Sequence, residues 1–298
     1  MKPLRTILAP TDLSALARHA VVRAALIAAD SGARLTLQHV VSMGSLDALR
    51  HLIDGGTGDV EQRLLDAVRG EVQALAADMG AAHGVVPDIA LAVGAVLSEI
   101  ASHADAIDAD LLVMGARGAG FMRELLIGST TERVLRKSTR PLLVVKQMAH
   151  EPYRRVLVPV DFSARALHAL RVAQQVAPQA ELVLLHAFEV PFEGKLRYAG
   201  VEDNALSGLR ANAGREASAR MNELVAAAGL DAHKVRRVVV HGEATSRILE
   251  QEQEQDCDLI VIGKRGLGVI EEMLLGSVTK HILAQSAADV LVADRDIA

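Results

Sequence analysis

Short apolar runs alternate with helix-length segments through the first half of the chain. Residues 4–10 are apolar and end in Pro-Thr-Asp, which predicts a strand followed by a turn. Ser14 can cap a helix that Gly32 ends. The expected strands are 4–10, 35–41, 85–93, 111–114 and 141–146, and the expected helices are 15–30, 59–82, 96–108 and 130–138, with a loop at 42–58.

The second half repeats this order. Residues 114–145 and 262–293 are identical at 13 of 32 positions with an offset of 148, and Asp12 and Asp161 lie 149 residues apart. This period is too long for a solenoid unit, so it indicates two copies of one domain, at 1–146 and 153–295. Strands are expected near 155–160, 181–188, 235–241, 258–262 and 289–293, and helices near 164–177, 203–228, 244–255 and 278–286.

Strands that alternate with helices predict an α/β fold with right-handed crossovers. We expect two tandem, doubly wound sheets, each of five parallel strands. Such sheets bind ligands at the carboxyl ends of their strands, at the topological switch point. The candidate site in each copy therefore follows strands one, two and four.

Composition narrows the function classes. Half of the residues are hydrophobic but only 2% are aromatic, so the core should be aliphatic, and backbone and aliphatic side chains should contact any bound adenine. A net charge of −5 disfavours nucleic-acid binding. The one cysteine excludes an internal disulfide and a multi-cysteine zinc site. No apolar stretch reaches the ~18–20 residues of a membrane span, and the N-terminal run is too short for a signal peptide, so we expect a soluble cytoplasmic protein.

A glycine pattern, G-x-x-G-x9-G-[ST], follows the fourth strand of each copy. Glycines let a ligand approach the backbone, and the free N–H groups at the start of the next helix attract phosphate. Nearby hydroxyls and arginines add donors. Glycines that merely connect a strand to a helix are the alternative. The candidate residues are Gly115, Arg117, Gly118, Gly128, Ser129 and Thr130 in copy one, and Gly263, Arg265, Gly266, Gly276, Ser277 and Val278 in copy two.

An aspartate follows the first strand of each copy, Asp12 and Asp161. Its carboxylate can accept hydrogen bonds from ribose hydroxyls or an adenine amino group, and the backbone at Val40 can hold an adenine edge. An aspartate in this place is also a common turn residue or helix cap, and that interpretation stays open.

On these residues the sequence resembles the universal stress protein family in its tandem form, over nearly the whole chain. The Pro-x-Asp and glycine motifs, each present twice, carry the resemblance. It implies an adenine nucleotide alpha hydrolase-like, Rossmann-like fold and an ATP site in each copy, with Mg²⁺ as an optional companion. By the family pattern, the two aspartates contact ribose or adenine, Val40 and Ala187 face adenine through their backbone, and Met114 and Ile262 line the nucleotide. The phosphates are held by the glycines, Ser129/Ser277 and Thr130/Val278.

The copies differ at the implied site. Val278 lacks the hydroxyl of Thr130, and Lys264 adds a charge where copy one has Ala116. The family also commonly dimerises through its final strand. Residues 141–145 and 290–293 are therefore candidate edges for a homodimer or for pairing of the two copies.

The functional hypothesis is a stress-response regulatory protein that binds ATP in each domain. No nucleophile elbow or acid–base pair is present, so a binding protein is favoured over an enzyme. The alternatives are a weak ATPase or self-phosphorylating protein, and a binder of a non-nucleotide ligand selected by the divergent segments 42–58 and 189–203.

Other reactive side chains favour ordinary interpretations. His39 and His186 match between the copies and are better explained as hydrogen-bonded histidines than as metal ligands. His51 and Asp54 are expected in a solvated loop. Cys257 lies between Asp256 and Asp258, and nearby carboxylates should raise its thiol pKa and disfavour a reactive thiolate.

Overall fold

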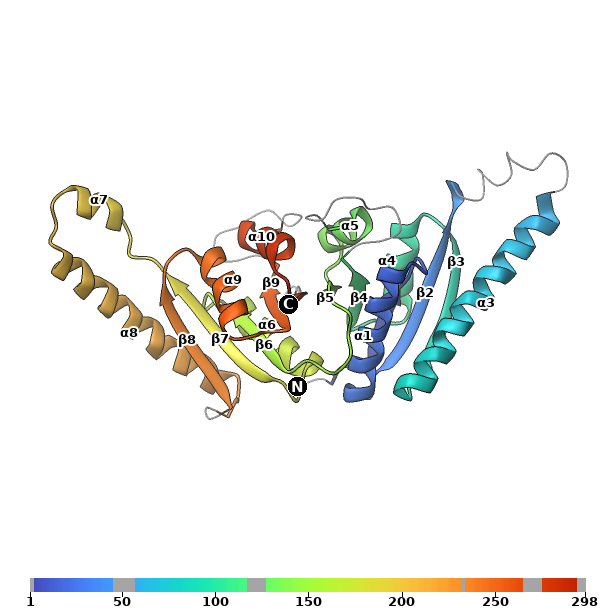
Figure 1. Ribbon diagram of the computed structural model, residues 1–298, viewed down its shortest axis with the longest axis horizontal. Helices are drawn as coiled ribbons and strands as arrows, with labels where there is room; N and C mark the ends of the chain where they lie inside the picture. Colours follow the sequence, from blue (N-terminus) through green and yellow to red (C-terminus); the bar gives the residue numbers. More distant parts are fainter. Residues whose placement is uncertain (1–2, 45–56, 117–126, 232–233, 265–274, 294–298) are drawn as a thin grey trace. The chain divides into compact units, whose positions relative to one another are not determined.

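The computed structural model describes residues 3–44, 57–116, 127–231, 234–264 and 275–293 (Figure 1). The chain divides into two compact units, one spanning Met1–Pro152 and the other Tyr153–Asp294. Each unit repeats the same sequence of strands and helices. The tandem two-domain organisation expected from the internal repeat is therefore confirmed.

In the first unit, strands and helices alternate as predicted. Ser14 caps the first helix by accepting a hydrogen bond from the Ala17 N–H group, and Gly32 ends it with φ +72°, so both predicted caps are confirmed. The elements are β1 (Thr6–Pro10), α1 (Ala15–Ser31), β2 (Arg34–Ser42), α3 (Thr57–His83), β3 (Asp88–Gly94), α4 (Val96–Ala106), β4 (Leu111–Gly115), α5 (Ser129–Lys137) and β5 (Leu142–Val145).

The second unit follows the same order, and its described residues also include the short helix α7. Its elements are β6 (Arg155–Pro159), α6 (Ala164–Val176), β7 (Glu181–Phe188), α7 (Glu193–Tyr198), α8 (Asp203–Ala227), β8 (Val235–His241), α9 (Ala244–Glu254), β9 (Leu259–Gly263), α10 (Ser277–Gln285) and β10 (Asp289–Ala293). Among the described residues, no helix is long and apolar enough to span a membrane.

Each unit contains a five-stranded parallel sheet. The strand order is β3-β2-β1-β4-β5 in the first unit and β10-β9-β6-β7-β8 in the second. The first strand of each unit, β1 or β6, pairs in parallel on both sides. The order in which strands are added to the sheet therefore reverses beside that strand. This reversal creates the crevice in which such folds bind ligands. The predicted fold class is confirmed.

Aliphatic side chains form the core of each unit. β1, β4, β6 and β9 are nearly continuous runs of buried residues, as expected for strands covered by helices on both faces. In the first unit α1 contacts α3, and α4 contacts α5. Tyr153 is a buried aromatic residue, and its hydroxyl donates a hydrogen bond of 2.6 Å to the fully buried carboxyl group of Asp289.

Two predictions of local structure were inaccurate. β3 begins at Asp88 rather than at 85, because α3 continues to His83 and Gly84 then adopts φ +69°. The segment 189–203 contains α7, which was not predicted. Glu193 in this short helix binds Arg210 and, at 2.8 Å, His241, and these hydrogen bonds, that of Arg210 first, keep the pKa of the Glu193 carboxyl below its usual range.

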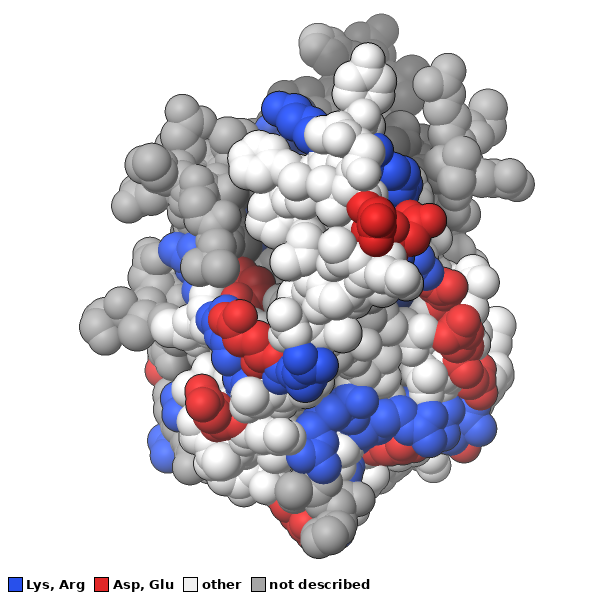
Figure 2. All heavy atoms as spheres, turned by 90° about the vertical axis from the view of Figure 1, so that its left-hand side faces the viewer, with Lys and Arg blue, Asp and Glu red and all other residues white. Residues whose placement is uncertain are grey.

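The edge strand β8 carries charged side chains. Arg236 and Arg237 are exposed; Arg236 lies 3.6 Å from Glu181, and Arg237 donates to Asn222 over 2.7 Å. Figure 2 shows basic and acidic side chains interspersed on the face turned to the viewer. Charges on an edge strand oppose pairing with another chain.

Candidate functional site

A cavity of about 280 Å³ opens at the carboxyl ends of β6, β7 and β9 in the second unit. The structure brings together there every predicted site residue of copy two that it describes. These are Asp161, Ala187, Ile262, Gly263, Gly276, Ser277 and Val278. Arg265 and Gly266 lie outside the described residues.

Several lining residues were not predicted from the sequence. The N-terminal turn of α6 contributes Ser163, Arg165 and Ala166, and α9 contributes Ala244 and Ile248. Pro159, Val160, Leu185, His186 and Thr279 complete the wall. The match of His186 and Thr279 with His39 and Thr131 in copy one was the available signal for two of them.

Asp161 holds the turn that leads from β6 into α6. Its Oδ1 atom accepts hydrogen bonds from the Ser163 N–H group (3.0 Å) and the Ser163 hydroxyl (2.6 Å). Asp12 Oδ1 likewise accepts from the Ser14 N–H group over 3.0 Å. The interpretation of both aspartates as turn residues is therefore confirmed. Asp161 also lines the cavity.

The turn places a strained residue after each aspartate. Leu13 has φ 63° and Phe162 has φ 61°, in the left-handed region that non-glycine residues rarely adopt. Such strain of order 1–3 kcal/mol persists only where the surrounding structure enforces it. The hydrogen bonds of the aspartates are part of that enforcement.

The matched histidines bind backbone carbonyl groups. His186 Nδ1 lies 2.8 Å from the Val160 carbonyl oxygen, and His39 Nδ1 lies 2.9 Å from that of Thr11. Because a carbonyl oxygen only accepts, Nδ1 carries the proton in each ring. The interpretation as hydrogen-bonded histidines is confirmed.

His186 adds a ring to the cavity wall that the composition did not predict. We expected only backbone and aliphatic groups to face a bound base, but His186 lines the cavity. The centroid of its ring lies 4.3 Å from the centroid of the Phe162 ring. The Cζ atom of Arg220 lies 4.4 Å from the centroid of the same Phe162 ring. The wall of this cavity therefore includes a supported imidazole ring.

The glycine segment ends at the N-terminus of α10. Gly276 is the N-cap residue and, having no side chain, makes no side-chain cap bond. The Thr279 hydroxyl donates a hydrogen bond to the Gly263 carbonyl oxygen over 2.9 Å. The Gly276 N–H group donates to the backbone carbonyl oxygen of Lys264, also over 2.9 Å. These bonds fix the first turn of α10 against the end of β9, so its N–H groups lie at the cavity, where they favour an anion.

The first unit has the same connections. The Thr131 hydroxyl donates a hydrogen bond to the Gly115 carbonyl oxygen over 2.9 Å, and the Gly128 N–H group donates to the backbone carbonyl oxygen of Ala116 over 2.7 Å. Pairing of β1 with β2 and β4 aligns the carboxyl ends that carry the predicted residues. These are Asp12, Val40, Met114, Gly115, Gly128, Ser129 and Thr130. Arg117 and Gly118 lie outside the described residues.

The two copies differ in charge around the site. Arg165 lines the cavity of unit two, where the corresponding residue of copy one is Leu16, 41% exposed. Arg165 forms no hydrogen bond or ion pair with the described residues. Lys264 is buried at the end of β9, where copy one has Ala116. The second cavity therefore offers an additional cation to an anionic ligand.

Cys257 is not a candidate nucleophile. Burial raises the pKa of its thiol to about 12, with the charge of Arg155 acting in the opposite direction and the neighbouring carboxylates adding to the increase. The predicted direction is correct, but the leading cause is burial rather than the carboxylates. Among the described residues, no group of three or more His, Cys, Asp or Glu side chains is placed to hold a metal ion.

Comparison with known proteins gives consistent matches to both copies. A universal stress protein of Mycobacterium tuberculosis strain H37Rv is 28% identical over 192 residues, which are 62% of this chain and 62% of that protein. This chain thus matches less than two thirds of that relative's length.

Two solved structures are similar to this chain to different degrees. A universal stress protein from Archaeoglobus fulgidus covers 97% of this chain and 98% of its own, with 24% identity and a TM-score of 0.65, which supports the fold. A universal stress protein in complex with cAMP is 28% identical and covers 48% of this chain and 97% of its own, with a TM-score of 0.32. The model of the universal stress protein family matches residues 3–146 and again 152–294, so the chain belongs to this family, with two tandem domains.

Proposed function

We propose that this chain is a cytoplasmic regulatory protein of the stress response that binds ATP in each of its two domains. The observation that carries the proposal is the cavity of unit two. The motif residues of copy two that the structure describes come from four separate segments, and all of them line this one cavity.

The chemistry of the wall suits an adenine nucleotide. Asp161 can accept hydrogen bonds from ribose hydroxyls, and the backbone at Ala187 can pair with an adenine edge beside the apolar side chain of Ile262. The first turn of α10 offers N–H groups and the Ser277 hydroxyl to phosphates. If Mg²⁺ accompanies ATP, its ligands would come mainly from the phosphates and water.

Regulation requires that ATP bind two conformations with different affinity. The site residues provide the groups that bind the nucleotide. Asp161 also accepts hydrogen bonds from Ser163 and so holds the turn after β6. A weak ATPase or self-phosphorylating protein is the second candidate, because Ser277 places a hydroxyl in the cavity. A non-nucleotide ligand is the third.

Native mass spectrometry of the purified chain and calorimetric titration with ATP, ADP, AMP and cAMP test these candidates. Co-purified ATP supports the proposal, ADP or phosphoserine supports the second candidate, and an unrelated mass supports the third. The double variant Gly118→Val, Gly266→Val should lose ATP binding. An unchanged titration would refute the assignment of the glycine motif.

A single substitution in the described cavity sharpens this test. Asp161→Ala should weaken ATP binding at the second site about tenfold or more, since a charge-assisted hydrogen bond contributes about 1.5–3 kcal/mol. Glu216→Ala removes an exposed carboxylate from α8 and should leave the titration unchanged. Equal affinities for both variants would contradict the role of Asp161.

We also propose that the final strands β5 and β10 are the association edges of the two domains, used within one chain or between two chains. Both strands are largely apolar, and each stands at one end of the strand order of its own unit. Sedimentation equilibrium of the chain and of a Val144→Lys variant distinguishes these cases, because only association between chains would change the mass.

A further inference from the structure

A second cavity, of about 150 Å³, lies in the first unit between α4 and the C-terminal end of α5. Ile100, Leu112 and Val134 form part of its apolar wall, and Lys137 and Arg140 also line it. It shares no residue with the predicted nucleotide site. A volume of this size exceeds the ~30 Å³ of one water molecule in the liquid and can hold a small organic ion.

The second unit shows what fits at the corresponding place. Position 104 is alanine in copy one, and the residue 148 positions later is Glu252. The Ala104 carbonyl accepts a bond from the Ala109 N–H group, and the Glu252 carbonyl accepts the matching bond from Cys257. The two positions are therefore equivalent in the fold.

The carboxyl group of Glu252 is buried and hydrogen-bonded. Its Oε1 atom accepts from the Ser286 hydroxyl over 3.1 Å and from the Ala288 N–H group over 2.6 Å. Glu252 is only 4% exposed. The turn after α10 is thus built to receive a carboxyl group that α9 supplies.

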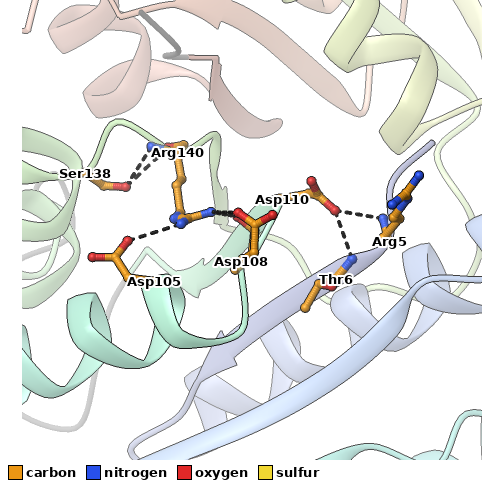
Figure 3. Close-up of polar contacts among 8 residues, drawn as sticks. Arg5, Thr6, Asp105, Asp108, Asp110, Ser138 and Arg140 are labelled. Carbon is orange, nitrogen blue, oxygen red and sulfur yellow. Dashed lines mark hydrogen bonds and ion pairs between the residues drawn. The ribbon is translucent and has the colours of Figure 1, made fainter. Parts of the chain in front are cut away.

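The first unit retains the same turn but lacks that carboxyl group. Ser138 and Arg140 stand where Ser286 and Ala288 stand in copy two, and the Arg140 N–H group donates to the Ser138 hydroxyl oxygen over 3.0 Å (Figure 3). Ala104 ends at its Cβ atom, and the cavity takes the place of the missing side chain. The missing fragment has the composition of acetate.

The charges in the first unit also favour an anion. Lys137, Arg140 and Asp105 line the cavity, where copy two has the uncharged Gln285, Ala288 and Gln253. Asp105 pairs with Arg140, so Lys137 is the cation left for an anionic ligand. The Arg140 guanidinium pairs with Asp105 at 3.1 Å and Asp108 at 3.3 Å (Figure 3). Lys137 makes no hydrogen bond or ion pair with the described residues.

We propose that this cavity is a binding site for a small aliphatic carboxylate. The carboxylate accepts hydrogen bonds from the Ser138 hydroxyl and from the Arg140 N–H group, as Glu252 does from their counterparts. The Arg140 N–H group exchanges its present bond to the Ser138 oxygen for this one. Lys137 supplies a compensating charge. The aliphatic tail of the ligand contacts Ile100, Leu112 and Val134.

The test is a titration of the full-length, isotope-labelled chain with sodium acetate, propionate and butyrate, against sodium chloride at equal ionic strength. The Arg140 amide resonance should shift in a saturable way with the carboxylates only. The dissociation constant should fall by about fourfold for each added methylene. Equal shifts with chloride, or no dependence on chain length, would overturn the proposal.

Three variants locate the site. Ala104→Glu supplies the carboxyl group within the chain, so the titration at Arg140 should disappear, whereas Lys137→Gln should weaken binding several-fold without altering the apolar wall. Glu252→Ala opens the corresponding place in the second unit, so acetate should raise the melting temperature of this variant more than that of the parent chain.

Other outcomes would contradict the assignment. If Ala104→Glu keeps the titration, or if only amides at the start of α5 respond, the carboxylate binds elsewhere. If Ala104→Glu does not fold, the Lys137→Gln variant and the chain-length series decide. A blocked glutamate derivative that binds more tightly than butyrate would replace the free acid with an acidic side chain of a protein partner.

Discussion

The hydroxyl group of Thr279 donates a hydrogen bond of 2.9 Å to the backbone carbonyl of Gly263. This bond joins the first turn of α10 to the end of β9, across the glycine segment that separates them in sequence. Thr131 and Gly115 make the same bond in the first unit, also at 2.9 Å. The threonine therefore holds the helix N-terminus in place beside the strand end in both domains.

Thr279→Val should destabilise the chain by about 1 kcal/mol, since Thr279 is 3% exposed and its loss leaves the Gly263 carbonyl without this donor. Urea-induced unfolding measures the change. Thr279→Ser retains the hydroxyl and should lose less stability through this bond. A valine variant as stable as the parent would show that the bond contributes nothing to folding.

Arg165 should make the second site selective for the more highly charged nucleotide, given the proposed function. In a chain whose first site is silenced by Gly118→Val, Arg165→Leu should weaken ATP binding about tenfold and AMP binding less. Calorimetric titration measures both affinities, and Arg165→Lys is the control that keeps the charge. Equal losses for ATP and AMP would contradict this role.

Glu243 should make the stability of the second unit depend on acid pH. Burial opposes ionisation of its carboxyl group, but hydrogen bonds from the Thr245 and Ser246 N–H groups, both 2.8 Å, outweigh it, and the pKa falls from 4.5 to about 2. A depressed pKa stabilises the fold above pH 4.5, and this contribution is lost as the pH falls toward 2.

The comparison with Glu243→Gln tests this expectation. The parent chain should be more stable by about 1 kcal/mol near pH 7, as is usual for a helix cap, and the difference should shrink between pH 4.5 and 2. Urea-induced unfolding across this range measures it. A difference that stays constant with pH would show that the charge of Glu243 has no part in capping α9.

Cys257 should be inert in the folded protein. With a thiol pKa of about 12, only about one molecule in ten thousand carries the thiolate at pH 8. Iodoacetamide should therefore label native protein far more slowly than protein in urea, as followed by intact mass. Fast labelling of the native chain would contradict the buried, protonated state.

Much of the fold can be predicted from the sequence because its signals are local. Ser14 binds the N–H group three residues ahead, and Gly32 adopts its left-handed conformation immediately after α1, so short sequence windows contain both interactions. The internal repeat adds long-range information, since one sheet topology must satisfy both copies. The motif residues of unit two were identified for the same reason.

What escaped prediction depends on contacts between distant segments. Glu193 binds Arg210 and His241, which follow it by 17 and 48 residues, and only folding reveals that α7 is held there. In the sequence, Arg165 is an ordinary residue of a predicted helix. Only the structure shows that the first turn of α6 places it at the cavity.

By itself, the sequence determined the family, the repeated parallel sheets and the motif residues, through apolar periodicity, capping residues and spaced glycines. The tertiary structure alone decided which side chains share a cavity, and it revealed that Glu252 fills a place that Ala104 leaves open. The physical reason is that periodicity and capping act within a few residues, whereas a cavity is the space left after segments distant in the sequence have packed together.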